Sequence, residues 1–519
     1  MDSRSSILDF KVNRRKLLAS GVAAIGGAVL SRLALGSVGG WAMDGPAQAF
    51  GRGHLGEGYG PIDFRPDGRD GVSRLALPEG FQYRSFSWSG ETMSDGNLVA
   101  LAHDGMAAFS LPNGNIRLVR NHEDRNSAGT GSVGGDPARK YDRQAFGGTT
   151  SLEVSPAGER ELLSHFVSLN GTTVNCGGGP TPWGTWLTCE ETTDGISQGF
   201  ERPHGYVFEV ASSATQTVDA VPIKVMGRFR HEAAAVDPVT GVVYLTEDNG
   251  LGGLYRFIPD DLGELANGGR LQMLAIEERP NYNTRAGQVA DEALAATWVD
   301  IDDPDPSEAE SNSHAVFDQG AAKGGALFYR LEGCWYGDRT IYFICSAGGQ
   351  AGLGQIWAYR PSPGGAGIAN LDRIAQSFNS DSAAADVNDD GAVDVRDLVM
   401  TGRNFGGDVG GQLLLVYESP DAGQLDSPDN LCVSPRGGLV LCEDGGGQQY
   451  LRGVDREGYI SAFATHNHQS YEWAGSCFSP DGQTLFVNIQ GPTRGPNPPP
   501  PGHEGMTIAI WGPWGNGGL

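Results

Sequence analysis

The clearest chemical pattern in the sequence is a twelve-residue run of oxygen-bearing side chains. Loop positions 1, 3, 5, 9 and 12 carry carboxylate or amide oxygens, and position 6 is glycine: Asp386, Asn388, Asp390, Asp394, Asp397 and Gly391. Calcium takes about six to eight oxygen ligands, and this spacing wraps the chain around one ion. The run therefore predicts an EF-hand calcium loop, with its exiting helix at 398–405.

The last ligand position of this loop resembles dockerins, because it is Asp397 and not the bidentate glutamate of calcium sensors. Dockerins pair two such repeats to bind cohesins, whereas the sequence contains one complete loop. A structural clip is therefore favoured over docking to a cohesin-type partner. The surrounding residues 362–411 turn polar and helical, which predicts a small dockerin-like module inserted between two strands.

A second set of acids falls in glycine- and tryptophan-rich strand and turn segments, not in charged helices. Such segments allow close backbone approach and a shaped pocket, which makes each acid a candidate metal ligand. The alternative for each is a solvated surface acid. The candidates are Glu123, Glu190, Glu191, Glu232, Glu247, Asp248, Glu332, Glu443, Asp444 and Glu472.

The seven cysteines lie between Cys176 and Cys477. Three disulfides would use six of them, so at least one thiol is left over. From counting alone, a small buried core residue is favoured for that thiol. The alternative is a thiolate metal ligand.

The elements that must position these residues are short and β-rich. Runs of four to six β-branched and aromatic residues between Gly, Pro, Asp or Asn turns predict strands at 205–210, 241–246, 254–257, 340–345, 355–359, 413–417, 438–442 and 483–488. Pro–Gly turn segments recur at 237–241, 434–438 and 479–482, as where a propeller blade's second strand turns into its third. The prediction is an all-β fold, a β-propeller with long insertions, and two packed sandwiches are the alternative.

The N-terminal residues have the pattern of an export signal. Arg14 and Arg15 precede a small, apolar run to about Leu35 that Arg32 interrupts, so the run is a poor membrane anchor. Ala47-Gln48-Ala49 offers a cleavage site. We expect residues 1–49 to be a twin-arginine signal, residues 50–519 to be the mature protein in the periplasm or outside the cell, and no membrane span after cleavage.

The amino-acid composition limits the classes of partner that the protein can bind. The 37 Lys and Arg residues against 63 Asp and Glu give a formal net charge of −26, which argues against nucleic acid or an anionic membrane as the main partner. Such acidity suits cation binding, and it also keeps a secreted protein soluble. With 79 Gly and 29 Pro but 39% apolar residues, the chain has many turns and enough material for a core.

Several segments read together resemble the PhoX family of secreted phosphatases, from about residue 75 to the end apart from the insert. The most specific is Asn175–Glu191, which reads NCGGGPTPWGTWLTCEE. The others are RNHE at 120–123, RHEA at 230–233, YLTED at 244–248, RLEGCW at 330–335, LDSPDN at 425–430, CEDG at 442–445 and EWAGSCF at 472–478.

The resemblance implies a six-bladed propeller with a cluster of calcium and ferric ions at one end of its central channel, and hydrolysis of small-molecule phosphomonoesters. It implies Cys176 as a thiolate ligand, with Glu232 and Glu332 as carboxylate ligands. Arg330 is the best candidate for holding a phosphate oxygen, with a salt bridge to a local acid as the alternative. The implied nucleophile is a metal-bound oxo or hydroxide, since no nucleophile elbow is present.

Other readings of the sequence remain open at this point. His122 and His231 rank low as bases, because a histidine beside a ligand glutamate more often orients it or fills the core. A non-catalytic calcium-binding propeller that acts in binding or as a scaffold is the alternative function. The proline-rich segment 493–501 departs from the family pattern. Either it alters access to the channel or it has no effect on function.

Overall fold

The computed structural model describes residues 55–289, 292–362, 410–469 and 471–519, which belong to one compact unit. The predicted calcium loop at 386–397 and the predicted signal at 1–49 lie outside the described residues. Within the described part of the chain, no helix is long and apolar enough to cross a membrane.

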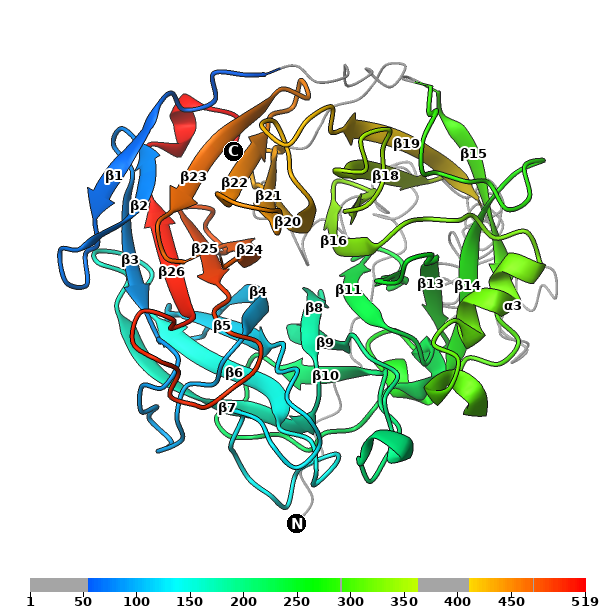
Figure 1. Cartoon of the computed structure of the whole chain (residues 1–519), viewed down its shortest axis with the longest axis horizontal. Coiled ribbons are helices and arrows are strands. Elements are labelled where there is room, and N and C mark those ends of the chain that lie inside the picture. Colours follow the sequence, from blue (N-terminus) through cyan, green and yellow to red (C-terminus); the bar gives the residue numbers. More distant parts are fainter. Residues whose placement is uncertain (1–54, 290–291, 363–409, 470) are drawn as a thin grey trace, which may run out of the picture. The chain divides into compact units, whose positions relative to one another are not determined.

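The described unit is built from antiparallel sheets arranged around a central axis (Figure 1). One sheet contains β4 (His103–Ser110), β5 (Ile116–His122), β6 (Gly147–Val154) and β7 (Leu162–Thr172). Another contains β8 (Asn175–Pro180), β9 (Thr185–Glu190) and β10 (Val207–Ala211). A nine-stranded sheet runs β11 (His231–Val236), β12 (Val243–Glu247), β13 (Leu254–Pro259), β14 (Gly269–Ile276), β15 (Leu294–Asp300), β19 (Gly411–Glu418), β18 (Gln355–Pro361), β17 (Thr340–Cys345) and β16 (Leu331–Gly337).

The two remaining sheets combine both ends of the described chain. The strands β20 (Pro428–Val433), β21 (Leu439–Glu443), β22 (Tyr450–Val454) and β23 (Ile460–His466) are extended by β2 (Ser73–Pro78) and β1 (Ile62–Pro66). The strands β24 (Trp473–Phe478), β25 (Thr484–Ile489) and β26 (Met506–Trp511) are completed by β3 (Gln82–Phe86). Because early and late strands pair within the same sheets, the circle of sheets is closed by hydrogen bonds between the two ends of the described chain.

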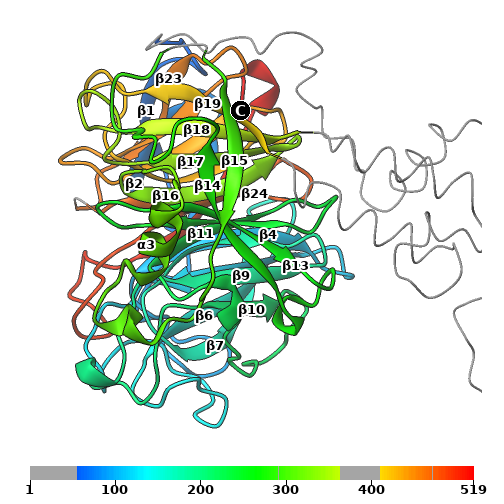
Figure 2. The same ribbon diagram turned by 90° about the vertical axis from the view of Figure 1, so that its right-hand side faces the viewer.

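Six strands lie innermost, and each contacts the next in a closed ring: β4, β8, β11, β16, β20 and β24. We call these the inner strands. A closed ring excludes two packed sandwiches and is the arrangement of a β-propeller. Hydrogen bonding divides the strands among five sheets, because β15 pairs with β19 and joins two groups (Figure 2), so the count of six blades stays a prediction.

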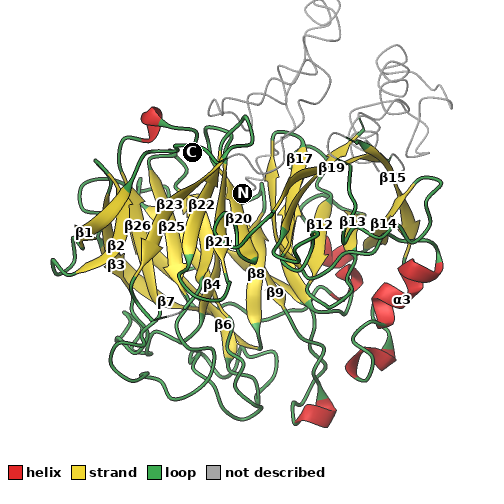
Figure 3. Cartoon of the chain, turned by 45° about the horizontal axis from the view of Figure 1, so that its top comes forward, coloured by secondary structure: helices red, strands yellow, loops and turns green. Residues whose placement is uncertain are grey.

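The helices lie outside the sheets (Figure 3). The α-helix α3 (Ala315–Ala322) packs on β14, and the remaining helical turns are η1 (Ile196–Gln198), η2 (Lys224–Met226), η3 (Leu265–Asn267), η4 (Ser307–Glu310) and η5 (Trp514–Asn516). Large side chains fill the space between sheets, with Trp186, Trp357 and Trp473 fully buried. The all-β prediction is therefore confirmed for the described residues.

The Pro–Gly turns lie one strand earlier than the sequence analysis places them. The turns at 237–241, 434–438 and 479–482 each join an inner strand to the second strand of its group, not a second strand to a third. A tight turn after the inner strand returns the second strand to the end where the inner strand begins. The candidate acids of both strands lie at that end.

The insert begins and ends at one point of a hairpin. Strands β18 and β19 pair antiparallel up to Pro361 opposite Gly411, and Ser362 N–H donates to the Gly410 carbonyl at 3.0 Å. The chain therefore leaves and re-enters this sheet between two paired strands.

Candidate metal centre and active site

The second residue of every inner strand occupies an equivalent place near the axis. These residues, which we call the inner-strand set, are Asp104, Cys176, Glu232, Glu332, Asp429 and Ala474. Five of the six carry a metal-ligating oxygen or sulfur. The equivalence follows from the propeller, because each group of strands repeats the same path.

A β-bulge aims each of these side chains. In all six pairs of inner and second strand, the register shifts just after the start of the inner strand. A bulge bends the strand and redirects side chains beside it, and bulges are common next to active sites. The residue after the ligand is glycine at Gly105, Gly177 and Gly333, where neighbouring inner strands approach closely. A Cβ atom at Gly177 would lie 2.5 Å from the Glu232 carbonyl oxygen, and one at Gly333 would lie 2.8 Å from the Leu431 nitrogen.

The residue directly after each second strand forms a further set around the axis. This second-strand set consists of Glu123, Glu191, Asp248, Ser346, Asp444 and Gln490. In all six groups its N–H donates to the carbonyl of the residue before the inner strand, at 2.9–3.2 Å. That residue has a left-handed backbone in four groups, with φ near 50° at Ala102, Val174, Arg330 and Ser427. The backbone thus fixes both sets relative to each other.

Ligating atoms from these sets form three overlapping groups in which all atoms lie within 4.8 Å of one another. The groups are Asp104–Glu123–Cys176, Cys176–Glu191–Glu232 and Glu232–Glu332–Asp429. Cys176 belongs to two of them, and its thiol donates to Glu232 at 3.2 Å. Burial and the neighbouring carboxylates raise the pKa of the Cys176 thiol well above its usual value.

The centre carries far more negative groups than positive ones. Nine carboxyl groups, those of Asp104, Glu123, Glu191, Glu232, Asp248, Glu332, Asp429, Asp444 and Glu472, face the guanidinium groups of Arg125, Arg230 and Arg330. Burial raises the pKa of Glu191 to about 8, and burial with Asp444 raises that of Asp429 to about 7.

Such crowding disfavours ionised carboxylates unless cations lie between them. The donor set therefore fits metal ions: carboxylate oxygens suit calcium, and the Cys176 sulfur among them suits iron better than calcium.

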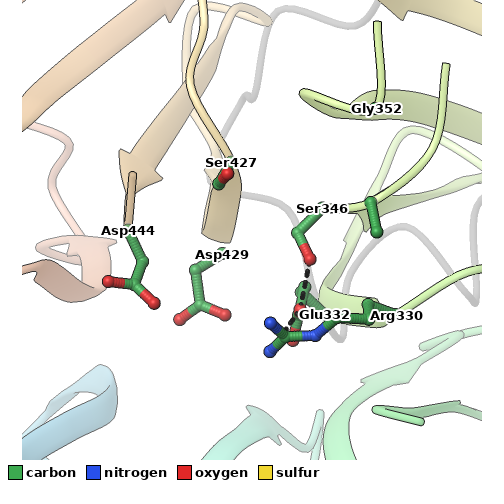
Figure 4. Close-up of a pocket in the computed structure, with 8 residues that line it drawn as sticks. Arg330, Glu332, Ser346, Gly352, Ser427, Asp429 and Asp444 are labelled. Atoms are coloured by element: carbon green, nitrogen blue, oxygen red, sulfur yellow. Dashed lines mark hydrogen bonds and ion pairs between the residues drawn. The ribbon is translucent and has the colours of Figure 1, made fainter. Parts of the chain in front are cut away.

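A cavity of about 110 Å³ opens beside this cluster (Figure 4). Its lining residues are Arg330, Glu332, Ser346, Ala347, Gly352, Ser427, Asp429 and Asp444. Arg330 Nε and Nη2 each donate to Asp248 at 3.0 Å, and Nη2 lies 3.2 Å from Glu332. Arg330 therefore forms the salt bridge that was its alternative role, and its half-exposed side chain also lines the cavity. Its binding of a phosphate oxygen stays a prediction. The Ser346 hydroxyl donates to Glu332 at 2.6 Å.

Residues 57–493 match the profile of the family described as "Alkaline phosphatase PhoX". This chain belongs to the PhoX alkaline phosphatase family. It is a phosphatase acting on phosphomonoesters, so the non-catalytic propeller is not the function. A comparison with curated protein sequences gave no match.

Among solved structures, Pseudomonas fluorescens PhoX in complex with vanadate, a transition state analogue, is similar with a TM-score of 0.60 and 17% identity. The match covers 88% of this chain and 99% of that chain, and at this identity it shows the shared fold, which confirms the β-propeller. A gluconolactonase from Xanthomonas campestris (TM-score 0.35, 12% identity, 88% of this chain and 98% of that chain) is far more distant. So is a regucalcin from Agrobacterium tumefaciens (TM-score 0.36, 9% identity, 83% and 96%).

The structure brings together Glu123, Cys176, Glu191, Glu232 and Glu332 near the axis, and it places Arg330 at the cavity. The role of these five residues as metal ligands stays a prediction. Glu190 and Glu443 belong to none of the three groups. Both are the last residue of a second strand and face away from the residue that follows them, because side chains alternate along a strand.

Contacts within the fold occupy these two acids. Glu190 accepts hydrogen bonds from His204 Nδ1 at 2.6 Å and from the N–H groups of Thr173, Gly205 and Tyr206. Glu443 accepts from Arg452 Nε at 2.7 Å and from two backbone N–H groups. Their role as metal ligands stays a prediction, and their contacts favour holding the turns in place.

The two histidines beside the ligands are buried. His122 contacts the Leu101 carbonyl at 2.7 Å and Thr150 Oγ1 at 2.9 Å, and His231 contacts the Gly227 carbonyl at 2.9 Å. Burial lowers the pKa of both. These contacts agree with their low rank as bases.

Sequence reasoning missed Asp104 and did not single out Asp429. The candidates are acids in glycine- and tryptophan-rich strand and turn segments, and neither Asp104 nor Asp429 is counted among them. A signal was present, since each is the second residue of a strand and is followed by a small or turn-forming residue, Gly105 and Asn430, as Cys176 and Glu332 are followed by glycine.

Glu190→Gln and Glu191→Gln form a matched pair of neighbouring substitutions that separates structural from ligating acids. We expect Glu190→Gln to lower the free energy of unfolding by about 2–3 kcal/mol, because charged hydrogen bonds to buried donors are lost. We expect Glu191→Gln to lower metal content, because it removes a carboxylate from the cluster. Elemental analysis and denaturant unfolding of both variants measure this. Metal loss in Glu190→Gln with unchanged unfolding contradicts the assignment.

Proposed function

We propose that this phosphatase is an exported enzyme whose activity depends on calcium and ferric ions held at the propeller axis. The observation that carries the proposal is the overlap of three ligand groups, in which Cys176 belongs to the first two and Glu232 to the last two. Cys176, Glu123, Glu191, Glu232 and Glu332, joined by Asp104 and Asp429, would hold the ions. Bound ions would supply positive charge to polarise a phosphoryl group and to activate the attacking group.

The chain's own residues bind and orient the substrate. Arg330 is held by Asp248 and Glu332 through Nε and Nη2, and its Nη1 makes no hydrogen bond to the described residues. This nitrogen can donate to a phosphoryl oxygen in the cavity without release of the salt bridge. Ser346 fixes one oxygen of Glu332, which keeps that carboxylate in place beside the bound phosphoryl group. Positioning and charge stabilisation supply most of the catalysis in phosphoryl transfer.

Removal of metal and of Arg330 tests this function directly. In the mature chain from Phe50, we expect turnover of a generic phosphomonoester to be lost with chelator and restored by calcium with iron. Arg330→Ala is expected to lower kcat/KM by about 10²–10³-fold, because a donor to the phosphoryl group is removed. Arg143→Ala, at an exposed salt bridge with Glu201, is the control and should leave kcat/KM unchanged. Full turnover in the chelated protein contradicts the proposal.

Export of the folded protein is part of the same proposal. All seven cysteines lie in the described residues, and all are free and buried. Folding in a reducing cytoplasm keeps such thiols available as ligands, and twin-arginine export moves a folded chain. We expect the double substitution Arg14→Lys and Arg15→Lys to abolish the periplasmic protein. Cell fractionation measures this, and normal export of the variant contradicts the signal.

We also propose a structural calcium ion in the insert, bound by Asp386, Asn388, Asp390, Asp394 and Asp397. Because β18 and β19 are paired at its ends, residues 363–409 can be replaced by a two-residue Asn-Gly hairpin turn. We expect this deletion to lower the calcium content by one ion per chain and to leave turnover intact. An unchanged calcium content contradicts calcium binding by the loop. Loss of turnover in a folded deletion variant contradicts the clip role.

A further inference from the structure

Arg125 lies between two carboxylates of the second-strand set. It follows Glu123 by two residues, and its Nη2 contacts both Glu123 Oε1 and Glu191 Oε2. These acids follow β5 and β9, the second strands of adjacent groups around the axis. A single nitrogen therefore links two neighbouring groups of strands. The side chain of Arg125 is 31% exposed, so its ion pairs with Glu123 and Glu191 are largely shielded from water.

The two acids belong to different candidate metal groups. Glu123 lies with Asp104 and Cys176, whereas Glu191 lies with Cys176 and Glu232. Without Arg125, Glu123 would lose its ion pair, and Glu191 would keep one with Arg230 Nη2 at 2.5 Å. An uncompensated charge on Glu123 beside Glu191 would add repulsion between the two buried acids. Two carboxylates in this arrangement are oxygen ligands of the kind calcium binds.

The backbone of Arg125 is fixed by the proline-rich segment that departs from the family pattern. Arg125 N–H donates to the Thr493 carbonyl at 2.9 Å, and Gly495 N–H donates to Asn126 Oδ1 at 3.1 Å. Gln490 Nε2 also donates to Glu123 Oε2 at 2.7 Å. The family match ends at residue 493, where this segment begins. The segment therefore acts on the site through the position of Arg125.

We propose that Arg125 is a built-in cation that takes the place of a divalent metal ion between Glu123 and Glu191. It thereby limits how many ions the centre binds. The inference rests on the proposed metal-dependent function. A guanidinium neutralises one charge and donates hydrogen bonds, but unlike a metal ion it offers no open coordination position. Arg125 is thus a positioning residue that acts through Glu123 and Glu191.

Counting metal in charge-removing variants tests this role. Mature wild type, Arg125→Met, Arg125→Lys and the exposed control Arg143→Met are stripped with chelator, reloaded with calcium and analysed for bound ions. We expect one additional calcium ion per chain in Arg125→Met. Arg125→Lys keeps the charge and Arg143→Met lies outside the centre, so neither should gain an ion. Calcium should also raise the melting temperature of stripped Arg125→Met more than that of the wild type, because binding to the folded state stabilises it.

The outcomes separate this inference from the proposed function. A wild-type calcium count in folded Arg125→Met overturns the inference, and a lower kcat/KM with that count means that Arg125 contacts the substrate. If Arg125→Met does not fold, Arg125→Gln removes the charge while keeping a hydrogen-bond donor, and the same count applies to it. A wild type that binds no metal at the axis overturns the proposed function. In that case an extra ion in Arg125→Met would still support the role of Arg125. The absence of an extra ion in Arg125→Met would overturn that role.

Discussion

Mutual repulsion among buried carboxylates is the constraint on which the rest of this structure depends. Oxygens of Glu232, Glu332 and Asp429 lie within 4.8 Å of one another, in a place where burial alone disfavours their charge. No single strand could hold such acids together against that repulsion. A closed ring of inner strands can, because each acid is anchored in a different group of strands and the whole ring would have to open for them to separate.

The backbone meets this constraint by repeating one device. A bulge opens each inner strand, and the N–H of each second-strand residue closes onto the carbonyl before that bulge. Because side chains alternate along a strand, the two acids of a neighbouring pair point in different directions and make different contacts. In Glu190–Glu191 the first acid fastens the turn at 205–206, and the second acid joins the centre. Fold stability and the proposed metal binding thus fall to adjacent residues of the same sequence motif.

The all-β class, the turn-rich sheets and most of the centre could be predicted because each leaves a local signal. Alternating apolar residues mark the strands, and acids in glycine- and tryptophan-rich strand and turn segments mark the candidate ligands. What could not be predicted depends on pairing between distant segments. Asp104 has no acid neighbour in sequence that joins it at the centre, and only the meeting of β4 with β8 and β24 brings it beside Cys176. The Pro–Gly turns were placed one strand off for the same reason, since strand order around an axis is not a local property.

The centre is unequal on its two sides, and that inequality gives the substrate a direction. Around β4 and β8, the second-strand acids Glu123 and Glu191 are tied together by Arg125. Around β16, the equivalent position is Ser346, a neutral residue, and the cavity opens there beside Arg330. A phosphomonoester is repelled where carboxylates are closely packed and attracted where a carboxylate gives way to a hydroxyl beside a guanidinium. Of the two neutral residues in the second-strand set, Ser346 and Gln490, only Ser346 lines the cavity. The proposed phosphoryl site therefore lies beside Ser346 and Arg330.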